Sequence, residues 1–499
     1  MKWIRPISAL LEETAEMVGS KAHGLVVLHR LGLPVPAGFV VTTEACRAFL
    51  RDGRLPGGLD DELATAIADL EAATGRHFGG AQVPLAVSVR SGASVSMPGM
   101  MNTILNLGLT SEATAGLAAE TGDARFALDS RQRFLSSFAS AITSDRPIPD
   151  DAAQQLELAV ETVFSSWDTP RARTYRELHD IPHHLGTAVI VQTMVFGNRD
   201  DRSGTGVAFS RDPNTGANVP FGEVLFGHQG EEVVSGRSLT RPLHELADRE
   251  PAVWAGLLDA LSRTEGHYRD ACYVEFTFQA GELWILQVRP GRFVGGAAVR
   301  VATDLADERV IGRHEALLRV SPQHLRHVRT HRIAEKTDIL ARGLGACPGV
   351  AVGRVATTSE KAVHMATDGP VILVRPETSP HDMRGLAAAT GIVTARGGPA
   401  SHAAVVARAM GKPAVVGITG LAIDAASVSA GGRTISEGTL VTIDGTSGEV
   451  VLGTPRIVTT TADAHLHRLL EWADDVSGDH TERDEAERLS AAHAVLRDQ

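Results

Sequence analysis

The apolar residues of the first 300 positions fall into short runs separated by stretches with helical spacing. The runs are rich in β-branched residues and predict strands at 38–43, 84–90, 187–195, 204–210, 272–278 and 283–290. The last two are separated by QAGE and indicate a hairpin. Apolar residues three and four positions apart predict helices over 127–142 and 151–166. The pattern therefore predicts a mixed α/β and α+β protein with several domains.

Changes in this pattern indicate where domains end. Residues 299–342 are charged, rich in histidine and helical in spacing, so we expect a helical linker there after a first domain over 1–298. Glycines and β-branched runs over 343–455 predict a compact α/β domain. The tail, 456–499, carries two charged amphipathic helices and is too short for another domain of ordinary size.

Composition narrows the functional classes. A net charge of −12 over 499 residues argues against broad nucleic-acid binding, which needs a basic surface. No apolar stretch reaches the roughly 18 residues of a membrane-spanning helix, and the N-terminus does not resemble a signal peptide. The cysteines, Cys46, Cys272 and Cys347, are far apart and form no CxxC pair. These features predict a cytoplasmic protein without membrane or nucleic-acid partners.

The most informative local motif is RGGPASHAAVVARAMGKP, at 396–413. Ser401 is a candidate N-cap for an alanine-rich helix that starts near His402 and stops at Gly411-Lys-Pro. A histidine in the first helical turn lies beside free backbone N–H groups and the positive end of the helix dipole, which stabilise a phosphoryl group on the ring. Imidazole is also a competent nucleophile near neutral pH. His402 is therefore a candidate phosphoryl carrier; the alternative is a histidine without a chemical role.

Two other segments suit phosphate binding. In SVRSGASVSMPGMMNTILNLGL (88–109), Arg90 ends a strand and leads into a glycine-rich loop that can approach phosphates and move as a lid, although it can also be an ordinary turn. In the predicted hairpin, Glu275, Gln287 and Arg289 occupy alternate positions, so their side chains can share one face. Such a face suits Mg²⁺ and a triphosphate; the alternative is a solvated strand face.

Several long motifs together resemble the pyruvate, phosphate dikinase family, in the same order along the chain. They are VGSKAHGLVVLHRLGLPVPAGFVVTTEAC, SMPGMMNTILNLGL, RFALDSRQRF, SWDTPRARTY, VQTMVFGN, SGTGVAFSRDPNTG, the EFTF…LQVRP hairpin and GGPASHAAVVARAMGKPAVVG. The similarity extends over about residues 1 to 475. It implies an ATP-grasp domain over 1–298 followed by a swivelling phosphohistidine domain over 343–455.

The resemblance also implies a set of nucleotide-binding residues. They are Lys21, Arg90, Gln192, Met194, Glu231, Glu275, Gln287 and Arg289. Within this set, Glu275 and Gln287 are implied to hold Mg²⁺, and the backbone near Gln192 and Met194 is implied to meet the adenine.

The implied reaction is a dikinase half-reaction on His402. This residue attacks the β-phosphorus of ATP, AMP leaves, and the terminal phosphoryl group passes to inorganic phosphate, which leaves phosphohistidine. The next acceptor stays open: a small molecule, or a separate barrel protein in a split dikinase. A third reading, from another class, is a non-catalytic ATP-binding protein.

Four departures from the family pattern stand out. Tyr273 replaces an acidic residue two positions before Glu275, Asn102 replaces the carboxylate of the usual MMDT, and Ala400 replaces a threonine that is phosphorylated in plant members. The family also continues into a (β/α)₈ barrel of roughly 250 residues for pyruvate and phosphoenolpyruvate. We expect this chain to lack that barrel, and with it the pyruvate half-reaction.

Overall fold

A computed structural model describes residues 2–95, 97, 100–142, 147–235, 240–291, 293–325, 328, 331–334, 338–399, 401–459 and 464–497. The side chains at 178, 231, 234, 235, 323 and 324 are outside this description. The chain forms two compact units, each considered by itself. Unit 1 comprises Met1–Ser203 and Phe276–Val288, and unit 2 comprises Gly204–Glu275 and Arg289–Gln499. The boundaries between the four predicted domains stay predictions.

Unit 1 is built on an antiparallel sheet in the order β1-β2-β7-β5-β6. Its strands are β1 (Ile4–Pro6), β2 (Gly38–Val41), β7 (Ala188–Thr193), β5 (Val87–Gly92) and β6 (Thr103–Leu107). A short parallel pair consists of β3 (His77–Phe78) and β4 (Pro84–Leu85). The predicted strands at 38–43 and 187–195 are thereby confirmed, and the strand predicted at 84–90 is divided between β4 and β5.

Helices cover this sheet and supply the other half of its core. They are α1 (Ala15–Arg30), α2 (Thr43–Asp52), α3 (Leu59–Thr74), α4 (Ser111–Thr121), α5 (Ala124–Ala141), α6 (Ala152–Ser166) and α7 (Pro170–Leu178), with a 3₁₀ turn, η1 (His183–Leu185). Val87 and Val89, two positions apart on β5, both enter the core, as the period of a strand requires. There they join Phe134 of α5 and Val160 of α6, so the predicted helices at 127–142 and 151–166 are confirmed.

A second five-stranded sheet has the order β10-β9-β8-β11-β12. Its strands are β10 (Arg241–Pro242), β9 (Phe221–Phe226), β8 (Gly204–Phe209), β11 (Cys272–Gln279) and β12 (Glu282–Pro290). The helices near these strands in sequence are α8 (Gly230–Ser235), α9 (Glu245–Arg249) and α10 (Pro251–Tyr268). The strands predicted at 204–210, 272–278 and 283–290 are confirmed.

The largest sheet lies in unit 2 and has the order β14-β24-β23-β16-β17-β18-β19-β15. Its strands are β14 (Ile339–Arg342), β15 (Leu344–Cys347), β16 (Val350–Ala356), β17 (Val371–Arg375), β18 (Gly391–Thr394), β19 (Ala414–Val416), β23 (Leu440–Asp444) and β24 (Glu449–Leu452). The four from β16 to β19 are parallel. In such sheets, functional side chains gather beyond the carboxyl ends of the strands.

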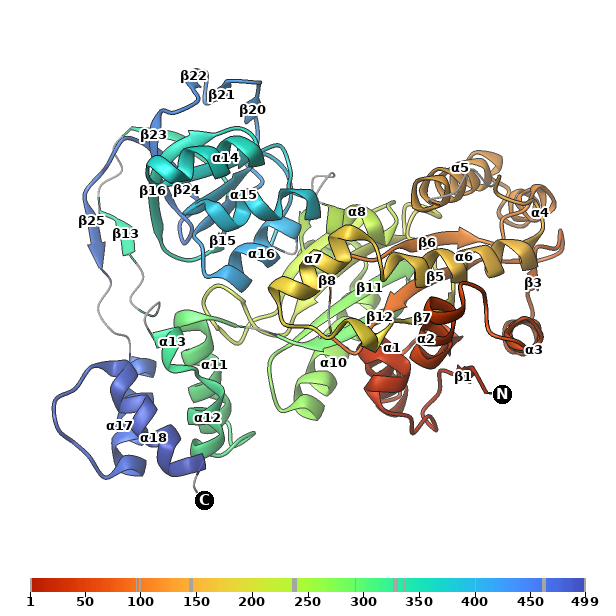
Figure 1. Ribbon diagram of the computed structural model, residues 1–499, viewed down its shortest axis with the longest axis horizontal. Coiled ribbons are helices and arrows are strands. Elements are labelled where there is room, and N and C mark those ends of the chain that lie inside the picture. The colour runs from red at the N-terminus through yellow and green to blue at the C-terminus, as the bar shows by residue number, and fades with distance from the viewer. Residues whose placement is uncertain are drawn as a thin grey trace. The chain divides into compact units, whose positions relative to one another are not determined.

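Helical turns connect the parallel strands (Figure 1). They are α14 (Ser359–Met365), η2 (Ala366–Asp368), η3 (Pro380–Asp382), α15 (Met383–Ala388) and α16 (His402–Met410). A three-stranded sheet of β20 (Ala422–Ile423), β21 (Ser427–Ala430) and β22 (Arg433–Ser436) follows. The helix predicted from His402 to Gly411 is therefore confirmed.

A helical cluster with its own core completes unit 2 (Figure 1). It contains α11 (Gly295–Asp307), α12 (Arg313–Arg319), α13 (Pro322–Leu325), α17 (Ala464–Ser477) and α18 (Glu485–Arg497). Leu305, Leu317, Leu469 and Leu489 meet in this core, so the two tail helices share it with the linker helices instead of standing alone.

The helical linker predicted over 299–342 is wrong in its last part. Residues His331–Ile333 form β13, which pairs with β25 (Ile457–Thr459), and Ile339–Arg342 form β14 of the large sheet. Leu340 is buried among the apolar side chains of that sheet. Pairing with distant strands therefore overrides the local helical pattern.

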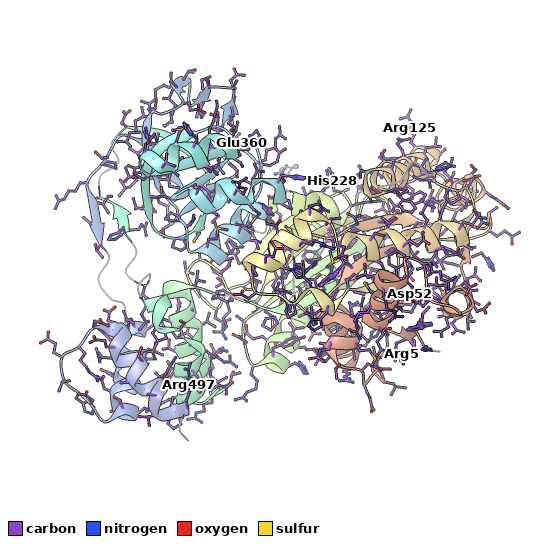
Figure 2. All side chains as sticks on the ribbon, in the orientation of Figure 1. Arg5, Asp52, Arg125, His228, Glu360 and Arg497 are labelled. Atoms are coloured by element: carbon purple, nitrogen blue, oxygen red, sulfur yellow. The ribbon has the colours of Figure 1, made fainter. Side chains whose placement is uncertain are left out.

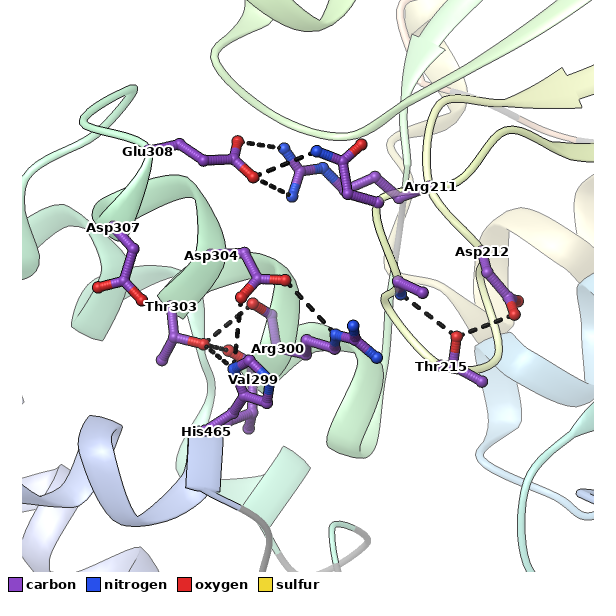
Figure 3. Close-up of polar contacts among 12 residues, drawn as sticks. Arg211, Asp212, Thr215, Val299, Arg300, Thr303, Asp304, Asp307, Glu308 and His465 are labelled. Carbon is purple, nitrogen blue, oxygen red and sulfur yellow. Dashed lines mark hydrogen bonds and ion pairs between the residues drawn. The ribbon is translucent and has the colours of Figure 1, made fainter.

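Buried charge ties the elements of unit 2 together (Figure 3). Arg211, which follows β8, is fully buried and bridges Glu265 of α10 (2.7 Å) and Glu308 after α11 (2.6 Å). These carboxylates raise its pKa against the effect of burial. On α11, Thr303 hydrogen-bonds His465 of α17 at 2.9 Å, which joins the tail to the linker helices.

Many ionic side chains cover the outside of the chain, including the exposed Asp52, Arg125, Glu360 and Arg497 (Figure 2). Within the described residues, none of the helices has the length and apolar character needed to cross a membrane.

Candidate functional site

His402 begins α16 directly after β18 and its following loop, at the carboxyl edge of the parallel strands. Ser401 is the N-cap, and its hydroxyl accepts a hydrogen bond from the Ala404 N–H at 3.5 Å. Gly411, with φ 63°, ends the helix in the left-handed conformation. The cap and stop read from the sequence are both present, and the histidine lies in the first turn, where backbone N–H groups favour an anionic group.

Thr378 fixes the orientation of the His402 ring. It follows β17, the neighbouring parallel strand, and its Oγ1 lies 3.0 Å from His402 Nδ1. If Nδ1 carries the proton and donates to Thr378, the lone pair of Nε2 is left to react. Burial lowers the pKa of His402 to about 4, and Asp382 offsets part of this effect, so the ring is neutral at pH 7.

Asp382 holds the turn that presents Thr378. Its carboxylate accepts from Ser379 N–H (2.9 Å) and from the Ser359 hydroxyl (2.7 Å), and Arg375 Nε lies 3.4 Å away. Ser379 and Asp382 form a capping box at η3. Sequence analysis missed this support, although the SPHD spacing is a capping signal.

Arg408, on the inner face of α16, is a second support that sequence analysis missed. Its guanidinium is buried and donates to the carbonyls of Pro399 (2.5 Å) and Ala346 (3.0 Å). Burial lowers its pKa to about 10, so it stays charged at neutral pH. The arginine thus fixes the loop before His402 from the helix that follows it.

The same loop requires glycine at position 398. A side chain there would begin 1.8 Å from an oxygen of Glu223 on β9, a buried carboxylate that also accepts from the Thr240 hydroxyl at 2.5 Å. Gly398 therefore lets the loop pass directly over Glu223 within unit 2.

Lys21 and the start of the glycine-rich segment lie together in unit 1. Gly19 interrupts α1 with φ 81°, and a side chain there would begin 1.8 Å from the Gly92 carbonyl oxygen. Ser20 N–H donates to Ala93 O at 3.0 Å, so the turn is fixed to the end of β5. Lys21 is the next residue in the chain. A Cβ added to Gly92 would lie 3.5 Å from the Cβ of Lys21. The kink therefore places Lys21 beside the strand that carries Arg90.

Arg90 is buried and held by its neighbours in unit 1. Its Nη2 hydrogen-bonds Gln192 Oε1 on β7 and the carbonyl of Leu286 at 3.1 Å. Gln192 is in turn fixed by donating to Pro36 O at 3.0 Å. The side chain of Gln192 therefore supports Arg90, a role that sequence analysis did not assign to it.

Glu275 and Arg289 are linked by Tyr273 in unit 2. The Tyr273 hydroxyl donates to Glu275 Oε1 at 3.3 Å, and the Arg289 guanidinium lies 4.3 Å from the centre of the tyrosine ring. Glu275 and Arg289 are both partly exposed, whereas Tyr273 is buried. One carboxylate and one arginine are thus presented near each other, as a metal–phosphate site needs.

The remaining residues that the sequence predicts to bind ATP have few described polar contacts. Met194 packs its partly buried side chain against a cluster containing Phe126 and Phe196, and its N–H donates to Ala86 O at 2.9 Å. Gln287 is partly exposed on β12 of unit 1. The side chain of Glu231 and the whole of Ala400 lie outside the described residues.

Asn102, which replaces an expected carboxylate, uses both ends of its amide. Its Oδ1 accepts from Arg171 Nη2 at 3.3 Å, and its Nδ2 donates to Ala141 O at 3.2 Å. Arg171 also donates to Met100 O at 3.2 Å. The glycine-rich segment is therefore held at its C-terminal end by α5 and α7, without a carboxylate.

The Glu275 carboxylate in unit 2 fits a Mg²⁺ ion whose other ligands are water and nucleotide phosphate oxygens. No cluster of three or more His, Cys, Asp or Glu side chains in the described part of the chain could hold a metal alone. Mg²⁺ commonly takes one or two protein carboxylates and completes its shell with water and phosphate oxygens. The partly exposed carboxylate of Glu275 suits that arrangement.

Two family models match the chain. Residues 52–241 match the model described as pyruvate phosphate dikinase, AMP/ATP-binding domain, and residues 367–448 match PEP-utilising enzyme, mobile domain. Pyruvate, phosphate dikinase 2 of Zea mays is 40% identical over 514 residues, which cover 92% of this chain and 58% of that protein. The chain belongs to the pyruvate, phosphate dikinase family.

Bacterial members of the family are similar to the same extent. Pyruvate, phosphate dikinase of Rhizobium meliloti (strain 1021) is 38% identical over 97% of this chain and 61% of its own length. The dikinase of Clostridium symbiosum is also 38% identical, over 95% of this chain and 60% of its own length. The chain therefore spans about three fifths of these dikinases. The mobile-domain match contains Thr378, Asp382, His402 and Arg408, and the AMP/ATP-binding match contains Arg90, Gln192 and Glu231.

Proposed function

We propose that this chain transfers phosphoryl groups from ATP to His402 and passes them on from there. The observation that carries the proposal is a neutral histidine in the first turn of α16, with Nδ1 held by Thr378 at 3.0 Å. The names of the similar dikinases support it.

The first step is the attack of His402 Nε2 on the β-phosphorus of ATP. A bond forms between Nε2 and this phosphorus, the bond to the α,β-bridging oxygen breaks, and AMP leaves with the electron pair. Nδ1 keeps its proton, so the phosphorylated ring gains positive charge, which Thr378 Oγ1 and the nearby Asp382 carboxylate stabilise. The terminal phosphoryl group then passes to inorganic phosphate and leaves as pyrophosphate.

The remaining residues in this proposal bind and orient the triphosphate. Lys21, Arg90 and Arg289 supply positive charge, and Glu275 and Gln287 would hold Mg²⁺. When bound, this ion would neutralise phosphate charge and polarise the phosphorus that is attacked. Because little covalent help is needed, positioning and charge account for most of the rate enhancement.

A labelling experiment tests the proposal. With Mg²⁺ and ATP labelled at the β-phosphorus, we expect label on the peptide that contains His402, acid-labile and alkali-stable, together with AMP rather than ADP. His402→Asn should abolish the label and keep the fold. Label that persists in this variant, or ADP as the product, would contradict the proposal.

The subsequent acceptor is a separate part of the proposal. A small molecule or a barrel-type partner protein can each take a phosphoryl group from phosphohistidine. Adding pyruvate to the labelled chain, alone and with a barrel protein, distinguishes them: loss of label with formation of phosphoenolpyruvate only in the second case supports the split dikinase.

A further inference from the structure

Tyr273 is a buried aromatic residue beside two charged side chains. It lies on β11 two residues before Glu275, so the two side chains leave the strand on the same face. Only 4% of its surface is exposed, and its ring packs edge-on against Phe209 of β8 with centroids 5.0 Å apart. Apolar neighbours therefore hold the ring in one place.

From this fixed position, Tyr273 contacts two charged side chains: its hydroxyl interacts with both Glu275 and Arg289, and its ring face contacts Arg289 alone. Its hydroxyl donates to Glu275 Oε1 at 3.3 Å, which leaves Oε2 for another partner. Its ring face carries the Arg289 guanidinium, 4.3 Å from the centroid. A cation held over a ring keeps its N–H donors at the edge of the guanidinium plane, where they can still bind phosphate oxygens.

We propose that Tyr273 is a positioning residue of the ATP site, with two separable effects. The hydroxyl orients Glu275 for a divalent cation, and the ring face, together with the hydroxyl, orients Arg289 for the phosphates. This proposal rests on the proposed function, because it assigns a ligand to each of the two charged residues. A tyrosine here supplies no charge of its own, so Glu275 is the only carboxylate among these three side chains.

The two effects predict different outcomes for two substitutions. Tyr273→Phe removes the hydroxyl and keeps the ring face over Arg289, so Mn²⁺ affinity in the presence of ATP should fall by roughly 3- to 10-fold, and metal-free ATP affinity should fall by less. Tyr273→Leu also removes the ring face, so metal-free ATP affinity should fall by roughly 3- to 30-fold. Phe209→Leu is the matched control, since it loosens the packing around Tyr273 and removes neither polar contact.

Mn²⁺ binding is measured by electron paramagnetic resonance and metal-free ATP binding by calorimetry in a chelating buffer, on the full chain, with the melting temperature of each variant recorded. Equal affinities in wild type, Tyr273→Phe and Tyr273→Leu would overturn the proposal. So would both affinities falling in parallel in all three variants, because that pattern reports packing alone. A wild-type chain that binds no ATP contradicts the proposed function instead, so the two failures are distinguishable.

Discussion

At the scale of single residues, two nearly isosteric replacements test the hydrogen bond between Thr378 and His402. Thr378→Val keeps the shape and removes the 3.0 Å contact to Nδ1, so the ring loses its fixed tautomer and the charge on the phosphorylated ring loses a partner. We expect the barrier to single-turnover labelling of His402 to rise by about 1–3 kcal/mol, which slows labelling roughly 5- to 150-fold. Thr378→Ser should recover most of the rate. Equal rates in the valine and serine variants would show that the hydroxyl has no role.

The ionisation of His402 provides a second prediction for a single residue. Its folded-state pKa of about 4 lies below the ordinary 6.5, so between these values the unfolded chain binds more protons than the folded one. The free energy of unfolding of the wild type should therefore be independent of the His402 titration above pH 6.5. It should decrease as the pH falls from 6.5 toward 4. Because asparagine does not ionise, the stability of His402→Asn should lack this part of the pH dependence.

Denaturation of both proteins at about pH 7.5 and about pH 5 measures the effect. The wild type should lose about 2 kcal/mol more than His402→Asn between these two conditions, because a shift of one pKa unit corresponds to about 1.4 kcal/mol. The same loss in both proteins would mean that other groups control the pH dependence.

At the scale of elements, the kink in α1 fixes the backbone just before Lys21, a predicted ATP-binding residue. Gly19→Ala meets both a positive φ of 81° and a carbonyl oxygen 1.8 Å from the new Cβ, so the turn before Lys21 must move. We expect a loss of about 2–4 kcal/mol in stability and a marked loss of ATP affinity.

Gly53→Ala is the control for this prediction. Gly53 also has a positive φ, 68°, at the end of α2, but no atom from outside its own stretch of chain lies within 4 Å of the place that a Cβ would take. The substitution should cost only about 1 kcal/mol and leave ATP binding intact. If both variants bind ATP like the wild type, the kink does not position Lys21.

The sequence could predict elements whose signals are local. His402 at the start of α16, with Ser401 as cap and Gly411 as stop, follows from three residues close in the chain. Thr378 lies 24 positions away, and only the parallel pairing of β17 with β18 brings it to the ring. Such long-range contacts leave no periodic signal, so the side chains around His402 were not predicted, whereas the helix start at His402 was.

At the scale of the whole molecule, the start of the predicted domain that carries His402 is open to test. The sequence predicts 343, but β14 (Ile339–Arg342) precedes that boundary and pairs with β24. Leu340 is only 4% exposed, and Arg433 Nη2 donates to Ile339 O at 2.8 Å. Sequence pattern alone placed this strand in a helical linker, because its partner lies more than a hundred residues downstream.

Two fragments of the chain, 338–456 and 343–456, therefore should differ in stability. The longer one keeps β14 and the burial of Leu340, which we expect to contribute about 2–4 kcal/mol to the free energy of unfolding measured in urea. Leu340→Ala in the longer fragment isolates the side chain and should account for about 2–3 kcal/mol of that difference. If both fragments unfold at the same urea concentration, β14 is dispensable and the region begins at 343. If only the longer one folds, the strand belongs to the region that carries His402, and any hinge for its movement must lie before residue 338.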